Sequence, residues 1–130
     1  FDRAEERRLG EHYVTELNIR TPSVDQVVSA LSGGNQQKVL LARWLCSGAR
    51  FLVLDDPVRG VDVGAKEEVF RLVRDLAAEG VAVLYITSEI REARTLGDRM
   101  LVMSDGRVVA ELPPNSTEGE IMTAAGGVHV

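Results

Sequence analysis

The residues Ser32-Gly33-Gly34 have the chemical character of a turn that binds phosphate. Two glycines without a Cβ let backbone N–H groups approach an anion closely, and the Ser32 hydroxyl adds a further donor. Residues 36–46 follow with an apolar pattern free of Gly and Pro, which predicts a helix whose N-terminus also favours an anion. Phosphate binding and a plain helix N-cap by Ser32 both explain so short a motif, and the motif alone leaves the two open.

Two carboxylates, Asp55 and Asp56, follow the unbroken apolar run 51–54 and precede Pro57. Such a run is typical of a strand buried on both faces, and open α/β sheets bind ligands at the C-terminal ends of their strands. Asp55 is a candidate magnesium ligand, because Mg²⁺ on nucleotide phosphates takes only one or two protein carboxylates. Asp56 is a candidate partner for an attacking water. A strand that ends in an ordinary Asp-Asp-Pro turn is the alternative for this segment alone.

Alternating helices and strands are expected to position these groups. Leu9, Tyr13 and Leu17 lie four residues apart and predict a helix up to about Leu17. Apolar residues at helical spacing predict a helix over residues 65–79 that stops at Gly80, and residues 81–86 predict a second strand. A strand, a helix and a strand in this order predict a parallel sheet.

The C-terminal part carries two local signals. Ser104-Asp105-Gly106 lies between the apolar stretches 99–103 and 107–112 and predicts a β-hairpin. Thr117-x-x-Glu120 predicts a capping box that opens a last short helix, and Gly126-Gly127 predicts the start of a frayed tail.

Taken together, these motifs resemble the C-terminal part of an ABC transporter ATPase domain. Residues 31–37 match the signature motif of that family, and residues 51–56 match its Walker B strand. The resemblance is closest to the second nucleotide-binding module of the tandem ATPases that drive bacterial sugar importers of the ribose, galactose, xylose and arabinose type. It rests on the form Asn35-Gln36-Gln37-Lys38 and on residues 59–66 after the Walker B strand. The implied fold is a partial P-loop NTPase-type α/β domain, with a parallel sheet, flanking helices, part of the helical subdomain and a C-terminal β-hairpin.

The resemblance also implies roles for individual residues, with ATP and Mg²⁺ as the bound groups. The nucleotide-binding set comprises Ser32, Gly33, Gly34, Asn35, Gln36, Gly60, Val61 and Asp62. Of these, Ser32, Gly33, Gly34 and Gln36 would face the γ-phosphate of an ATP held by the opposite module. Gly60-Val61-Asp62 would be the D-loop at the interface between modules. Asp55 would serve the metal, and the catalytic set would be Asp56, Ser88 and Glu89.

Two of these positions depart from the family pattern. The usual Walker B strand ends in Asp-Glu, whereas Asp56 is shorter by one methylene and reaches less far towards a water. Ser88 occupies the place of the switch histidine, and a hydroxyl supplies neither positive charge nor a shuttled proton. Residues 87–89 also suit a helix cap before residues 90–96, and the two roles do not exclude each other.

The sequence contains no Gly-x-x-x-x-Gly-Lys-Ser/Thr phosphate loop. The nearest imitation starts at Gly60, but Ala65 interrupts its Gly-Lys pair and Glu67 replaces the hydroxyl residue. We therefore expect a fragment of one ABC ATPase domain, inactive in isolation. Residues 1–48 would belong to the helical subdomain and signature helix, and residues 49–130 to the core with the Walker B strand, D-loop and switch loop.

Composition narrows the function classes. The 130 residues are 45% hydrophobic and 27% charged, and the net charge of −5 argues against a nucleic-acid surface. Apolar runs are too short to span a bilayer, so direct membrane insertion is not expected. The single cysteine, Cys46, excludes an internal disulfide and is predicted to be a buried thiol. His12 and His129 are too isolated to predict a metal site.

The resemblance implies two partners, a second ABC ATPase module in the same chain or in a dimer and the transmembrane permease subunits of a sugar importer. The implied location is peripheral, at the cytoplasmic face of the bacterial cell membrane. One alternative is a non-transport ABC ATPase fragment, for which coiled-coil heptads or basic arms would be expected. The other is a catalytically inert dimerisation piece.

Overall fold

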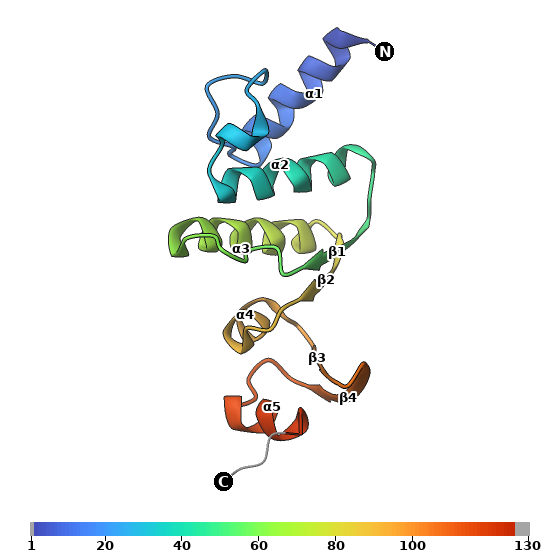
Figure 1. The fold of residues 1–130 in the computed structure, drawn as a ribbon. Coiled ribbons are helices and arrows are strands. Elements are labelled where there is room, and N and C mark those ends of the chain that lie inside the picture. The colour runs from blue at the N-terminus through green and yellow to red at the C-terminus, as the bar shows by residue number, and fades with distance from the viewer. Residues whose placement is uncertain (1, 127–130) are drawn as a thin grey trace. The chain divides into compact units, whose positions relative to one another are not determined.

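The computed structural model describes residues 2–126, which form two compact units (Figure 1). The first unit ends at Leu84 and the second begins at Tyr85. In chain order the elements are α1 (Arg3–Glu16), the 3-10 helix η1 (Val28–Ala30), α2 (Gly33–Cys46), β1 (Phe51–Asp55), α3 (Val63–Ala78), β2 (Ala82–Ile86), α4 (Ile90–Leu96), β3 (Met100–Ser104), β4 (Arg107–Leu112) and α5 (Glu118–Ala124). The predicted helices and strands are confirmed to within a few residues at their ends.

Helices α2 and α3 lie side by side in the first unit (Figure 1). Helix α2 begins after Ser32, and α3 begins after Asp62, whose Oδ1 accepts a hydrogen bond from the Ala65 N–H at 3.0 Å. Each helix buries one stripe at three- and four-residue spacing: Gly34, Lys38, Leu41 and Ala42 on α2, and Val69, Phe70, Val73 and Leu76 on α3. The apolar stripe of α3 follows the periodicity of its sequence, and this packing sets where the start of α2 lies.

Strands β1 and β2 are hydrogen-bonded neighbours in a parallel pair connected by α3. In β1, Leu52 and Leu54 are buried, while Phe51 and Val53 are 60% and 54% exposed. The prediction of a strand buried on both faces is therefore wrong for this chain. An apolar run shows that both faces tolerate burial, but only a second packed layer removes both from water.

The second unit contains the predicted hairpin. Strands β3 and β4 pair antiparallel, and Ser104 pairs with Arg107 across a two-residue loop. Both loop residues have positive φ, 47° at Asp105 and 73° at Gly106, which is the backbone that an Asp-Gly hairpin loop favours. Helix α5 packs Ile121 against Met100 and Val102 of β3. Its start carries the predicted capping box, in which the Thr117 side chain accepts from the Glu120 N–H and the Glu120 carboxylate accepts from the Thr117 N–H.

Cys46 is exposed, so the prediction of a buried thiol is also wrong. The buried stripe of α2 ends at Ala42, one turn earlier, and Cys46 instead lines an open groove of about 720 Å³ between α1, α2 and the loop that joins them. The predictions for Gly127 and His129 lie outside the described residues. Between residues 2 and 126, no helix is both long and apolar enough to cross a bilayer.

Candidate functional site

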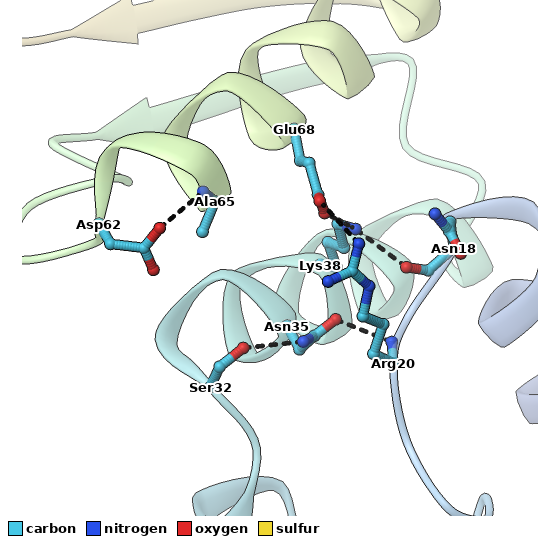
Figure 2. Close-up of polar contacts among 8 residues, drawn as sticks. All are labelled: Asn18, Arg20, Ser32, Asn35, Lys38, Asp62, Ala65 and Glu68. Carbon is cyan, nitrogen blue, oxygen red and sulfur yellow. Dashed lines mark hydrogen bonds and ion pairs between the residues drawn. The ribbon is translucent and has the colours of Figure 1, made fainter.

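Ser32 stands immediately before α2 with extended backbone (φ −61°, ψ 156°), which is the conformation of an N-cap residue. Its side chain nevertheless makes no capping hydrogen bond to the helix. The Ser32 Oγ instead accepts a hydrogen bond from Asn35 Nδ2 at 2.8 Å (Figure 2). The capping explanation therefore holds for the backbone of Ser32 and not for its hydroxyl.

The two glycines of the turn meet different surroundings. A Cβ added to Gly33 would find its nearest neighbour at 3.7 Å, the Cγ2 of Val61, which is an ordinary van der Waals contact. A Cβ added to Gly34 would lie 2.6 Å from the Cβ of Ala65 on α3, closer than real Cβ atoms approach. Gly34 is buried and permits the close packing of α2 on α3, whereas Gly33 is exposed and leaves the start of α2 open to a ligand.

A polar network connects α2 to the loop after α1 and to α3 (Figure 2). The Nζ of Lys38 donates to Glu68 Oε2 at 2.8 Å and to the carbonyl oxygen of Asn18 at 2.9 Å. Arg20 donates from Nη2 to Glu68 Oε1 at 3.2 Å. The hydrogen bond and charge of Lys38 hold the pKa of the Glu68 carboxyl below its usual value, and the charge of Arg20 acts in the same direction. This network fixes α2 against its neighbours on two sides.

Lys38 is 3% exposed, and sequence reasoning did not identify it or its partners as positioning groups. The available signal was its place in the apolar stripe of α2, four residues after Gly34 and three before Leu41. A lysine in such a stripe requires a carboxylate or carbonyl partner. The identity of that partner, Glu68 at a separation of 30 residues, is not contained in the helical pattern.

Asn35 and Gln36 follow the two glycines, and their side-chain amides form hydrogen bonds to other groups of this chain. Asn35 Oδ1 accepts from the Arg20 N–H at 2.8 Å while its Nδ2 donates to Ser32. Gln36 Nε2 donates to the carbonyl oxygen of Leu31 at 2.8 Å. Contact of either side chain with a nucleotide stays a prediction.

The predicted D-loop, Gly60-Val61-Asp62, lies beside the start of α2. Gly60 has a φ of +73°, which favours glycine, and Val61 follows as the neighbour of Gly33. Asp62 is the N-cap of α3. The structure therefore brings the two predicted segments 32–34 and 60–62 together through local contacts.

Asp55 and Asp56 stand at the C-terminal end of β1, as predicted. Asp55 is exposed, so its carboxylate is available to a hard cation that also binds phosphates, and the residue fits such a group. Asp56 has a φ of +48°, a left-handed conformation that Asp tolerates better than most residues. Its Oδ2 lies 4.0 Å from Arg59 Nη1. Among the described residues, no cluster of three His, Cys, Asp or Glu side chains could hold a metal ion by itself.

Ser88 and Glu89 belong to the second unit, between β2 and α4, and both are exposed. The Glu89 N–H donates to Thr87 Oγ1 at 2.9 Å, and that hydroxyl donates to the buried carboxylate of Glu92 at 2.9 Å. Glu89 is the N-cap residue of α4 but makes no side-chain capping bond. Thr87 therefore accepts from the N-cap residue of α4 and not from an N–H group of the helix itself, so the structure shows no side-chain cap from residues 87–89, and the Ser88 and Glu89 residues are exposed.

Comparison with known proteins agrees with this arrangement. Residues 4–59 match the ABC transporter family model. The chain belongs to the ABC transporter family, as the sequence motifs predicted. It is 48% identical over 126 residues to the arabinose import ATP-binding protein AraG of Ralstonia nicotianae and 50% identical over 127 residues to the ribose import ATP-binding protein RbsA 2 of Streptomyces avermitilis. These matches cover 95% and 97% of this chain and 25% of each relative, so the chain spans about a quarter of their length.

Solved structures share the fold. The dimeric ABC transporter cassette MJ0796 has a TM-score of 0.71 and 24% identity, with 90% of this chain and 50% of that chain covered. The same cassette bound to ADP and Pi after hydrolysis has a TM-score of 0.72 at the same identity and the same coverage. The described residues therefore form part of an ABC ATPase fold of the P-loop NTPase type.

Proposed function

We propose that this chain is the C-terminal part of an ATP-hydrolysing module that energises sugar import through an ABC transporter. The observation that carries the proposal is the exposed start of α2, where Gly33 is accessible and the Ser32 hydroxyl makes no capping hydrogen bond to the helix. The ion pair between Lys38 and Glu68 fixes this helix against α3. The relatives at about 50% identity are named as arabinose and ribose import ATP-binding proteins. ATP binding and sugar import are carried over to this chain from those names.

In the proposed assembly, the turn 32–34 contributes donors to an ATP that is held by a second ATPase module, in the same chain or in a dimer. The Ser32 hydroxyl and the backbone N–H groups at the start of α2 would stabilise negative charge on the terminal phosphate as it develops during hydrolysis. Residues 60–62 would lie at the interface between the modules. The transmembrane permease subunits would be the further partners, at the cytoplasmic face of the membrane.

The ATP that this module itself holds would be bound and hydrolysed with the help of four other residues, Asp55, Asp56, Ser88 and Glu89. Asp55 is the residue that would hold Mg²⁺, which neutralises phosphate charge when it is bound. Asp56 would accept a proton from the attacking water, but its short side chain and the missing histidine charge at Ser88 make this site the weaker one. The two sites of the assembled protein would thus differ in activity.

The test compares Gly33→Asp with Asp56→Asn in the full-length parent protein assembled with its permease. Gly33→Asp places a like charge against the phosphate and should lower ATP turnover by at least ~10²-fold, because it disrupts a donor array for the transition state. Asp56→Asn should cost less than about tenfold, since it removes a base from an already weak site. Sugar uptake by cells that carry each variant should fall in the same order.

Exposed Asn115 provides the control, because Asn115→Asp adds the same charge on a loop outside the proposed site and should leave turnover at the parent rate. If Asp56→Asn is as damaging as Gly33→Asp, the division into a working and a weakened site is wrong. If the parent hydrolyses ATP but does not support uptake of any sugar, the non-transport alternative is favoured.

A further inference from the structure

The side-chain amide of Asn35 lies between the Ser32 hydroxyl and the backbone of Arg20 (Figure 2). Asn35 Oδ1 accepts from the Arg20 N–H at 2.8 Å, and Asn35 Nδ2 donates to Ser32 Oγ at 2.8 Å. Arg20 is itself anchored, because its guanidinium donates to Glu68 Oε1 at 3.2 Å and the other oxygen of Glu68 accepts from the buried Lys38. Asn35 therefore connects the proposed phosphate-binding turn to the loop after α1.

The direction of both hydrogen bonds follows from elementary chemistry. A backbone N–H can only donate, so the Asn35 atom that faces Arg20 must be the oxygen. The amide nitrogen then faces Ser32 and can only donate, so Ser32 Oγ must accept. The Ser32 hydroxyl proton cannot point towards Asn35 and must point elsewhere.

Within residues 2–126, the Ser32 hydroxyl donates to no acceptor, and it makes no capping bond to α2. Its proton is therefore available to a group outside the described chain. Ser32 is exposed, so an external acceptor can reach it.

We propose that Asn35 is a positioning residue, which acts through Ser32 and does not itself contact the nucleotide. By donating to the Ser32 oxygen, it keeps the hydroxyl proton directed outwards, where it serves a phosphate oxygen of the ATP held by the partner module. This inference rests on the proposed function of the turn 32–34. It assigns to Asn35 a different role from the direct nucleotide contact predicted from the sequence.

The discriminating variant is Asn35→Asp, which has nearly the same shape and still accepts from the Arg20 N–H. Its second oxygen faces Ser32 as an acceptor, so the Ser32 hydroxyl turns inwards to donate to it and is lost to the phosphate. In the assembled full-length parent, Asn35→Asp should lower ATP turnover at least roughly tenfold, and Ser32→Ala should have an effect of similar size.

A double-mutant cycle separates positioning from charge repulsion and from damage to the fold. In a Ser32→Ala background there is no hydroxyl to capture, so adding Asn35→Asp should cost less than about threefold. An equal cost in both backgrounds would mean that the new carboxylate repels phosphate or perturbs the turn, and the positioning role would be overturned. The positioning role is also wrong if Ser32→Ala impairs turnover while Asn35→Asp does not.

The failure of the proposed function gives a different result, namely that Ser32→Ala turns over ATP at the parent rate. In that case the signature role of Ser32 is wrong, and the role of Asn35 falls with it. Asn115→Asp, which changes an exposed asparagine in the same way, should leave the rate unchanged and controls for added charge.

A measurement without nucleotide tests the same hydrogen bonds in the 130-residue chain. Solvent exchange of the Arg20 amide, followed by NMR, should be slow in the parent and in Asn35→Asp and should accelerate at least tenfold in Asn35→Ala, which has no acceptor. Ser32→Ala should shift the Asn35 side-chain amide resonances and leave those of Asn115 in place. An Arg20 amide that exchanges equally fast in all three proteins would overturn the proposal.

Discussion

Gly33 and Gly34 are neighbours in the sequence, but they are glycine for different reasons. Gly33 is exposed at the proposed phosphate-binding turn, and a Cβ there would make only an ordinary van der Waals contact with Val61. Gly34 is buried against Ala65 of α3, where a Cβ would approach to 2.6 Å. One glycine therefore leaves access for a ligand, and the other allows two helices to pack closely.

This difference predicts that Gly34→Ala destabilises the chain by about 1–3 kcal/mol, because overpacking forces α2 and α3 apart. Gly33→Ala should change the free energy of unfolding by less than about 0.5 kcal/mol, as is usual for exposed positions. Urea unfolding of the 130-residue chain followed by circular dichroism measures both. The second substitution Ala65→Gly should restore part of the loss in Gly34→Ala, and equal midpoints for both single variants would contradict the packing argument.

Helices α2 and α3 are joined by a buried polar contact as well as by apolar packing. Lys38 is almost fully buried, and Glu68 supplies its carboxylate from α3. Removing one partner of such a pair leaves an uncompensated charge, which costs more than the pair contributes relative to apolar residues. The pair therefore makes the relative placement of the two helices specific.

We predict that Glu68→Gln lowers the free energy of unfolding by about 2–4 kcal/mol, because the Lys38 charge loses its partner. Glu67→Gln makes the same chemical change at an exposed neighbouring position and should alter it by less than about 0.5 kcal/mol. Chemical denaturation at pH 7 measures the difference. A Glu68→Gln variant as stable as Glu67→Gln would show that the ion pair contributes nothing specific.

The same contact predicts a dependence of stability on pH. The pKa of Glu68 is lowered in the folded chain, so its contribution is fully present above the unfolded pKa of about 4.3 and is lost as the pH falls through the folded pKa. The stability difference between the parent and Glu68→Gln should therefore be constant from pH 7 to about 5 and shrink below about 4. A difference that stays constant down to pH 3 would contradict the assignment.

The 130 residues carry the proposed signature turn, the proposed D-loop and the proposed Walker B carboxylates, but they contain no Gly-x-x-x-x-Gly-Lys-Ser/Thr loop. In P-loop ATPases that loop holds the phosphates through backbone N–H groups and a lysine. Under the proposed function, these 130 residues supply groups to a partner's ATP, and the phosphate-binding loop for the ATP of this module is not among them. The chain also leaves one face of β1 exposed.

We predict that the 130-residue chain alone does not hydrolyse ATP above a control without protein. Binding of Mg-ATP should be no tighter than roughly millimolar, which corresponds to about 4 kcal/mol, because these 130 residues contain no Gly-x-x-x-x-Gly-Lys-Ser/Thr loop. Phosphate release and isothermal titration measure the two quantities. Hydrolysis that Asp55→Ala abolishes would contradict the prediction.

The sequence was sufficient for features that depend on a few neighbouring residues. The helix at residues 90–96, the Asp105-Gly106 loop and the Thr117–Glu120 capping box were all predictable, since backbone φ values and hydrogen bonds within four residues decide them. The motifs at residues 31–37 and 51–56 were also sufficient for the family, because their residue types and spacing are specific.

Only the tertiary structure decided which side chains are buried and what they contact. Lys38 meets Glu68 and Asn35 meets Arg20 across 30 and 15 residues, and no periodicity in the sequence specifies such partners. The exposed face of β1 and the exposed thiol of Cys46 were mispredicted for the same reason. An apolar side chain is buried only where another element covers it, and that depends on how distant segments pack, which local patterns do not contain.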